Sequence, residues 1–486
     1  MILIIICIIL LPAVASCDAS TDGSSEYESY DATYGYRTSG STSADYSSEL
    51  ISVRSDADIL YVQAAIEGYP LRIISEGAFD GLDVDILVIP ATVEVMSASP
   101  FQGTSIEEVV FLGDRPQGLE DLGGHRVSAL DGARGWNGID LLDVKTVDSG
   151  SGKVSFTVIS GEATVLSHVS GTEVMIPEHV EWDGSKHTVT RIGDRAFYGA
   201  DVTLVYMPDS IRVIGVRAFY LCDKMVDANI PGSIEVVCDE AFRECAKLQN
   251  VDLHGVRFLG FESFRMCYSM TEVRVPDSTT DVRGGAFYVC SSIESVSLGR
   301  SVDLIDERVF GYTSSLNEFS FDGTVAEVRQ SAFYRSAITS IDLPDVTDIG
   351  DMAFYQCDRL ESVTFGSGLI SIGESSFSKC LLLEEVSFPP TLENIGNMCF
   401  YDCRSLEKVT FNGDMPEFGS DVFRDTDASL FALASHADSW KEYEGDISFI
   451  DEGKGENQGS EIYGFLVVVF IVVSTMAYIM IRRRHD

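Results

Sequence analysis

The chain has 486 residues, with 76 acidic against 34 basic side chains, which gives a formal net charge of -42. This surplus of negative charge repels nucleic acids and anionic membrane surfaces, so partners of either kind are not expected. It favours solubility, and it also fits saline surroundings or a basic partner. The length exceeds what one compact core needs and predicts an extended or composite architecture.

Residues 1–16 predict a signal peptide, because an apolar run at residues 2–11 is followed by Ala13-Val14-Ala15, an A-x-A cleavage site. The same segment ends in Ser16-Cys17, which leaves lipidation of Cys17 open as an alternative. Residues 17–48 are rich in Ser, Asp, Tyr and Thr and poor in aliphatic side chains, so they predict a disordered arm.

Residues 49–195 are expected to precede the main repeat array and to fall into three segments. Two repeat-like turns, at Phe79 and Phe101, form a short first segment at residues 49–112. Residues 113–152 are glycine-rich and predict a loop or a divergent turn. Residues 153–195 combine strict alternation at residues 154–158 with a hairpin signal at Trp182-Asp183-Gly184, and they predict the start or cap of the main array.

Residues 196–428 carry a repeat in which phenylalanines recur every 21 to 23 residues. A fixed period in this range is typical of leucine-rich repeats, whose turns bury their apolar residues only against neighbouring turns. The predicted core phenylalanines are Phe197, Phe219, Phe242, Phe264, Phe287, Phe310, Phe333, Phe354, Phe377, Phe400 and Phe423.

Each turn shares a second pattern, h-x-x-h-x-h followed in many turns by Pro and then by Ile-Gly-x-x-Ala-Phe. The last two apolar positions lie on one face of a strand by alternation of period two, so successive strands should form a parallel sheet. The Ile-Gly segment is too short for a long helix and predicts a short strand or a 3-10 turn on the opposite face. The fold class expected is mainly β, a right-handed solenoid, with one C-terminal transmembrane helix.

The combined pattern, clearest at residues 372–403, resembles the BspA-type leucine-rich repeats of cell-surface proteins from bacteria, archaea and some protists. The resemblance runs from Phe197 to Phe423 and includes the two turns at Phe79 and Phe101. It implies a surface protein used in adhesion or in contact with a host or matrix. It brings no catalytic residues with it.

Eleven cysteines in an exported chain would usually suggest disulfides. Seven of them follow a repeat Phe by three residues, and neighbours in such a column have parallel Cβ vectors about one strand spacing apart, which does not suit a disulfide. Cys238 and Cys399 stand where other turns have Gly or Ala. We therefore expect buried thiols that act as small core residues. The column comprises Cys222, Cys245, Cys267, Cys290, Cys357, Cys380 and Cys403.

The C-terminal part predicts a cap, a linker and an anchor. Residues 429–445 should seal the last turn with Leu430, Phe431, Leu433 and Trp440, and residues 446–461 form an acidic linker. Residues 462–481 are about twenty uncharged, mostly apolar residues, enough to span a bilayer. The arginines in residues 482–486 predict a short cytoplasmic tail with the repeats outside.

Motifs for catalysis, metals and cofactors are missing from the sequence, so no cofactor and no enzymatic activity are expected. His179 and His187 flank the predicted hairpin and could meet across it, although two surface histidines are the simpler interpretation. A hydrolase on a repeat scaffold is the least supported hypothesis.

The outward position of each predicted strand offers a candidate binding surface, with a plain solvated face as the alternative. Its N-terminal half includes Tyr206, Asn229, Asp252 and Arg274, and Tyr and Arg are enriched in binding hot spots. The leading hypothesis is a membrane-anchored extracellular protein that recognises or adheres to a protein or glycan. The alternative is a structural envelope or surface-layer component that self-associates. The oligomeric state stays open.

Overall fold

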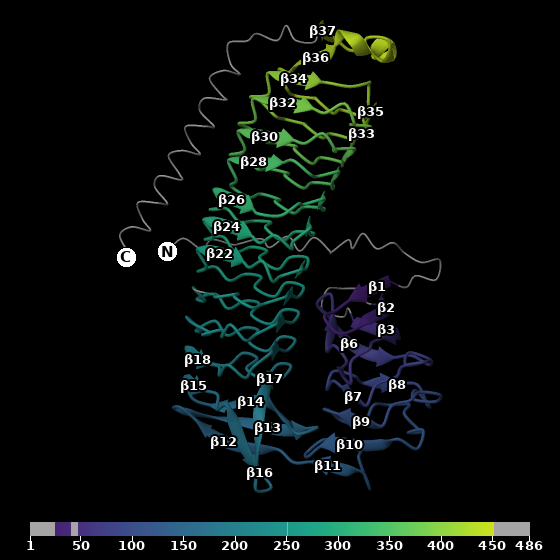
Figure 1. The fold of residues 1–486 in the computed structure, drawn as a ribbon, viewed down its shortest axis with the longest axis vertical. Helices are drawn as coiled ribbons and strands as arrows, with labels where there is room; N and C mark the ends of the chain where they lie inside the picture. The colour runs from purple at the N-terminus through teal and green to yellow at the C-terminus, as the bar shows by residue number, and fades with distance from the viewer. Residues whose placement is uncertain (1–24, 40–46, 250, 452–486) are drawn as a thin grey trace, which may run out of the picture.

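The computed structural model describes residues 25–39, 47–249 and 251–451 of the chain. The predicted signal peptide, Cys17, most of the acidic linker, the predicted transmembrane helix and the cytoplasmic tail lie outside these residues. Within them, no helix is long and apolar enough to cross a membrane. The described chain is a mainly β solenoid with almost no helix, folded into two arrays that lie side by side (Figure 1).

The first array spans β1 to β11 and has two sheets, in the orders β1-β2-β3-β6-β5, with β8 beside β6, and β11-β10-β9-β7-β4. The second sheet is parallel throughout. The strands are β1 (Ser25–Glu28), β2 (Thr33–Ser39), β3 (Ser47–Arg54), β4 (Ile59–Tyr61), β5 (Ala65–Ile66), β6 (Tyr69–Ile74), β7 (Ile86–Ile89), β8 (Val95–Met96), β9 (Glu108–Phe111), β10 (Arg126–Leu130) and β11 (Asp140–Leu142).

In this array one sequence-based prediction is wrong, and another is narrowed to one of its two alternatives. Residues 25–39, expected in a disordered arm, form the ordered strands β1 and β2, because Tyr34 and Tyr36 are buried in the core of the array and supply the apolar area that aliphatic residues usually give. The glycine-rich residues 113–152 contain β10, which continues the parallel ladder from β9, so this stretch includes a divergent turn.

The main array starts with an antiparallel meander and a hairpin. The strands are β12 (Lys145–Ser149), β13 (Gly152–Ile159), β14 (Glu162–Ser170), β16 (His179–Trp182) and β17 (Ser185–Ile192). The pair β16 and β17 is antiparallel and turns at Asp183-Gly184, as the sequence predicts. Strand β17 also pairs with β14, in parallel, and this pair begins the parallel stack.

Above this start, the turns form two parallel stacks of strands, and the front stack has a gap between β18 and β22. The front strands are β15 (Glu173–Met175), β18 (Leu204–Tyr206), β22 (Glu272–Val275), β24 (Ser295–Leu298), β26 (Glu318–Phe321), β28 (Ser340–Leu343), β30 (Ser362–Phe365), β32 (Glu385–Phe388), β34 (Lys408–Phe411), β36 (Ser429–Leu433) and β37 (Ser448–Ile450). Their burial alternates between exposed and buried residues, as expected for strands with one face in the core.

The back strands have only two residues each, which confirms the expected short strand. After β17 they are β19 (Val213–Ile214), β20 (Val236–Val237), β21 (Phe258–Leu259), β23 (Asp281–Val282), β25 (Leu304–Ile305), β27 (Glu327–Val328), β29 (Asp348–Ile349), β31 (Ser371–Ile372), β33 (Asn394–Ile395) and β35 (Glu417–Phe418). The second residue of each pair points into the core.

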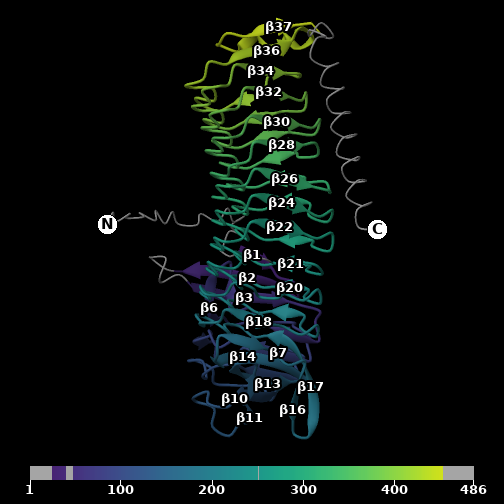
Figure 2. The same cartoon turned by 90° about the vertical axis from the view of Figure 1, so that its left-hand side faces the viewer.

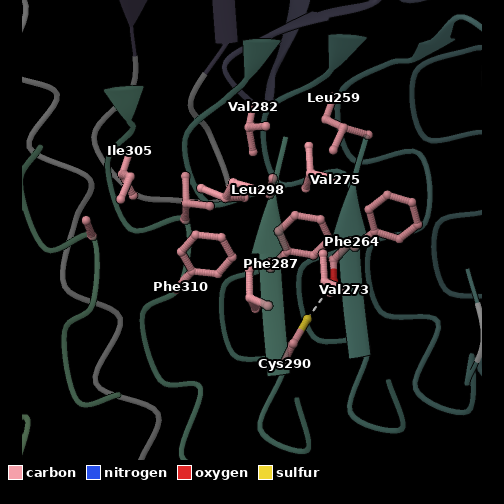
Figure 3. Packing of buried hydrophobic residues seen from close by; sticks show 14 of the residues in the cluster. Leu259, Phe264, Val273, Val275, Val282, Phe287, Cys290, Leu298, Ile305 and Phe310 are labelled. Carbon is pink, nitrogen blue, oxygen red and sulfur yellow. Dashed lines mark hydrogen bonds between the residues drawn. The ribbon is translucent and has the colours of Figure 1, made fainter. Parts of the chain in front are cut away.

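A stack of phenylalanine rings runs through the main array from Phe197 to Phe423. Consecutive rings lie between 4.8 Å (Phe197 and Phe219) and 5.9 Å (Phe287 and Phe310) apart, centroid to centroid. All but Phe423 are buried, and Phe423 is packed against the same cluster. Figure 3 shows the rings of Phe264, Phe287 and Phe310 in one cluster with front-strand residues such as Val275 and back-strand residues such as Leu259. The central prediction of one shared core is confirmed.

The two arrays run in opposite directions, so that the first array covers the lower half of the main array (Figures 1 and 2). It packs against the back strands, where Val216, Val236 and Phe258 form a cluster with Ala64 and Ala65. A second cluster joins the outer face of β7 and β9 to Ile159 of β13. The sheet that contains β7 is thus buried on both faces, and for this reason all four residues of β7 are apolar.

The C-terminal end closes the main array. There β36 is followed by the 3-10 helices η1 (Ala434–His436) and η2 (Ser439–Glu442). Trp440 of η2 is buried and packs on Phe411 at 4.8 Å, while its Nε1 donates to the carbonyl of Gly413 at 3.3 Å. The indole therefore covers the last turn of the core.

Candidate binding surfaces

The front sheet carries the strand-face column that the sequence nominates. Tyr206 ends β18 and is 42% exposed, and Arg274 lies in β22. The column continues in register through Ser297 of β24 to Ser320 of β26. Arg274 is not a free cation, since its Nε lies 2.6 Å from Oε1 of Glu272 in the same strand. This ion pair offsets the positive charge of Arg274.

Asn229 and Asp252 lie between Tyr206 and Arg274 in the column. Both are exposed, but they do not lie in strands, contrary to the expectation of a strand in every turn. The backbone N–H of Asn229 binds Oδ1 of Asp227 at 2.7 Å, and that of His254 binds Oδ1 of Asp252 at 2.9 Å. Such local side-chain acceptors compete with the strand ladder for the backbone donors. The front sheet is therefore interrupted between β18 and β22.

An exposed apolar pair at the start of the front sheet was missed by the sequence reasoning. Met175 of β15 lies directly beside Tyr206 in the parallel pair β15 and β18, and it is 57% exposed. The sequence does contain a signal for this residue, because Met175 occupies the outward position of the repeat-like segment before Pro177. Met175 and Tyr206 give this end of the column an anchor suited to a partner with apolar groups.

The C-terminal half of the column is small and polar. Its members are Asp342, Thr364, Ser387 and Thr410, which pair across parallel strands. Thr364 donates a hydrogen bond to Asp342, and Ser387 accepts one from Asn412 at 3.0 Å. These side chains satisfy one another, as a solvated strand face would.

A second surface runs along the corner where each turn passes the core phenylalanine. Tyrosines that follow the Phe stack on one another, as in Tyr334 and Tyr355 at 5.2 Å. Cations cover several rings, with Arg335 at 5.5 Å from Tyr334 and Lys379 at 5.7 Å from Tyr355. Because the ring faces are occupied by neighbours, this column stabilises the corner and leaves ring edges for contact.

The buried thiols behave as core groups. The described cysteines are unpaired and buried, which confirms the expectation from their spacing. Each column thiol donates to the carbonyl of a Phe one turn earlier, as Cys290 does to Phe264 at 3.0 Å (Figure 3). Burial raises the pKa of Cys290 to about 12, so its thiolate is suppressed.

The histidines that flank the hairpin do not face each other. His179 pairs with Thr188 across β16 and β17, while His187 pairs with Val180. His187 Nδ1 lies 2.8 Å from the carbonyl oxygen of Gly161. The described residues hold no group of three or more His, Cys, Asp or Glu side chains that could bind a metal ion.

A cleft of ≈ 630 Å³ opens where the first array meets the back strands. Tyr30 and Asp31, from the loop between β1 and β2, form one wall, and Arg257 and Phe258 lie on the other. Tyr30 contacts Phe258 edge to face at 6.1 Å, and its hydroxyl accepts a hydrogen bond from Arg191. The cleft thus belongs to the contact between the arrays.

Comparison with known families agrees with this architecture. The profile described as "BspA type Leucine rich repeat region" matches six copies over residues 184–257, 239–346 and 326–443, together more than half of the chain. This chain belongs to the BspA-type leucine-rich repeat family. The match begins at the hairpin of the main array and ends at the cap, so the first array lies outside it. No protein of curated function matches the chain.

Several solved structures are similar to the chain at low identity. A leucine-rich repeat protein from Bacteroides ovatus is 21% identical, with 63% of this chain and 99% of that chain covered and a TM-score of 0.38. A leucine rich cell surface protein from Faecalibacterium prausnitzii is 20% identical, with 63% and 94% covered and a TM-score of 0.34. The pneumococcal vaccine antigen PcpA is 14% identical, with 88% and 98% covered and a TM-score of 0.30.

Proposed function

We propose that this BspA-type protein is an exported, membrane-anchored recognition protein that binds an extracellular protein or glycan through the front sheet of its main array. The observation that carries the proposal is the placement of the first array. It packs on the back strands, so the described chain leaves the front sheet open along the whole main array. Curved repeat sheets present such a face to ligands.

Within the front sheet, the end around Tyr206 is the proposed contact. Met175 and Tyr206 are adjacent and exposed, whereas the polar residues near Thr364 satisfy one another. Aromatic anchors in the centre of an interface supply most binding energy. The net charge of -42 favours a partner that is neutral or basic over an anionic one.

Localisation at the cell surface rests on the family and on the sequence. The predicted signal peptide at residues 1–16 and the predicted anchor at residues 462–481 support export with the repeats outside. Leucine-rich-repeat solenoids typically serve as non-catalytic scaffolds, which favours recognition over hydrolysis.

The test is binding of the purified protein to immobilised matrix proteins, glycans and neighbouring cells. We expect saturable binding that Tyr206→Ala weakens by about 2 kcal/mol, or roughly thirtyfold in Kd, if Tyr206 is a hot spot. The matched control is Thr410→Ala at the equivalent position of β34, which should leave the Kd unchanged. Absence of saturable binding would contradict recognition. Ordered assembly on sizing at high protein concentration would instead favour the self-associating envelope component.

A further inference from the structure

One carboxylate at the contact between the arrays is buried without a cation beside it. Asp239 lies in the turn after β20 and is 1% exposed. Its Oδ1 accepts the backbone N–H of Phe261 at 2.9 Å and the hydroxyl of Tyr27 from β1 at 2.7 Å. Its Oδ2 has no hydrogen-bond partner among the described residues. The first array therefore closes over this side chain.

The same turn position occurs where no array covers it. Asp351, in the turn after β29, accepts the backbone N–H of Glu374 at 2.7 Å, just as Asp239 accepts that of Phe261. Asp351 is exposed. The aspartate at this position thus holds the next turn. Asp194 does the same for Val216 and is also largely buried at the contact, but it has Arg191 at 3.7 Å, whereas Asp239 has no ion-pair partner among the described residues.

The neighbours of Asp239 are mostly acidic or neutral. Glu240 and Glu67, the second from the first array, both disfavour its negative charge. The nearby cations are committed to other groups: Arg217 binds Glu240 at 2.6 Å and the carbonyl of Gly68, and Arg191 lies beside Tyr30 and Asp194.

Other titratable groups complete the surroundings of this side chain. Cys238 is its neighbour in the chain, and burial, together with the smaller effect of the charge of Asp31 from the loop between β1 and β2, raises the pKa of Cys238. Burial also raises the pKa of Tyr27, and the charge of Arg283 lowers it in part. Arg243 binds the far side of Glu240 at 2.9 Å. None of the ion pairs among the described residues includes Asp239, so its charge is not balanced locally.

We propose that the contact between the two arrays is a pH-sensitive closure, stable when Asp239 is protonated and weakened when it is ionised. Opening would expose the apolar back-strand surface at Val216, Val236 and Phe258, together with the cleft beside Tyr30. The front sheet is not part of this device, so it operates independently of partner binding there.

The sign of the effect follows from the environment of the carboxyl group. Burial raises the pKa of Asp239 from its ordinary value to about 7, and the hydrogen bonds from Tyr27 and Phe261 lower it only in part. A carboxyl group with a raised pKa in the closed state holds more protons there than in the open state, where water reaches it. Closure is therefore complete below the ordinary pKa of aspartate and weakens as the pH rises to about 7.

Burial also raises the pKa of Glu240, Glu67, Asp31 and Asp194. These carboxyl groups act in the same direction as Asp239, so the wild-type dependence on pH combines several contributions. A single substitution removes only one of them.

Hydrogen exchange of the full-length protein from about pH 5 to about pH 8, corrected for the intrinsic exchange rate, measures the closure. Peptides from β1, β2, β20 and β21 report on the contact, and peptides from β30 to β34 serve as an internal reference. For one proton, the protection of contact peptides should fall by up to tenfold per pH unit until the pH reaches about 7. The reference peptides should show no such fall.

Variants assign the effect to Asp239. Asp239→Asn keeps an acceptor for Tyr27 and Phe261 without the charge. The protection of contact peptides should therefore fall less steeply with pH than in the wild type, and the two slopes should differ by up to one unit of log protection per pH unit. Asp351→Asn, the matched control, should retain the wild-type dependence. Tyr27→Phe removes a donor that favours the ionised carboxyl, so opening should be greater near neutral pH. Unchanged steepness in Asp239→Asn, equal flattening in Asp351→Asn, or pH-independent wild-type protection would overturn the proposal.

Discussion

The repeat phenylalanine is the residue on which each turn depends. Phe264 is fully buried, with rings at 5.1 Å on the Phe242 side and 5.7 Å on the Phe287 side. Its carbonyl oxygen also accepts the thiol of Cys290 in the next turn. A single side chain thus links three turns through dispersion contacts and one weak hydrogen bond.

Substitution of Phe264 tests this role. Phe264→Ala should destabilise the main array by about 3 to 5 kcal/mol, because it removes buried area and leaves a cavity between two rings that cannot collapse independently. Urea denaturation followed by circular dichroism measures the loss. Phe449→Ala, at a ring in β37 that is 45% exposed, provides the control and should change stability far less. Equal losses for the two variants would contradict a shared core.

The tight corners after the front strands are the decisive feature at the scale of elements. Parallel strands in neighbouring turns bring their corners close together, and at some corners a side chain would have no space. A Cβ on Gly366, just after β30, would lie 1.6 Å from the carbonyl oxygen of Pro344 in the turn before. Two residues on, a Cβ on Gly368 would meet only Thr347, at 4.0 Å.

These two glycines form a matched pair for a test. Gly366→Ala should destabilise the array by about 1 to 3 kcal/mol, because the corner must move away from Pro344. Gly368→Ala should be neutral or stabilising by up to about 1 kcal/mol, since it reduces the entropy of the unfolded chain without a clash. Thermal unfolding of both variants distinguishes them, and a similar Tm change in both would be inconsistent with corner packing.

At the scale of the whole molecule, the two arrays end in the same way. Trp136 packs on Phe111 at 4.5 Å and donates to the carbonyl of Gly113 at 3.0 Å. Trp440 repeats this arrangement with Phe411 and Gly413. Each terminal turn would otherwise expose its core, and in both arrays an indole covers it.

Loss of a cap should therefore loosen only the array to which it belongs. Trp440→Ala should lower hydrogen-exchange protection of β34 to β36, at a cost of about 3 to 5 kcal/mol locally, and leave β9 and β10 unchanged. Trp136→Ala should produce the opposite pattern. A uniform loss of protection across both arrays in either variant would show that the caps act globally.

Several elements could be predicted from the sequence because their causes are local. The period of the phenylalanines, the alternation within each front strand and the hairpin at Asp183-Gly184 all depend on residues within one turn or its neighbour. Tyr206 and Arg274 lie in front strands, as the alternation predicts. The prediction of a strand was wrong at Asn229 and Asp252, where aspartate side chains accept hydrogen bonds from backbone N–H groups.

The sequence alone thus determined the repeating unit, the stacked core and the reduced cysteine column, because solenoid turns interact mainly with adjacent turns. Only the tertiary structure decided that residues 25–39 are ordered and that the first array covers the back strands. Phe258 is the outward residue of β21, and the equivalent residue of β29 is the charged Asp348. Phe258 is apolar because it is buried in the contact with the first array. Contacts between arrays join residues as far apart as Tyr27 and Asp239, and no periodicity within the chain encodes such a pairing.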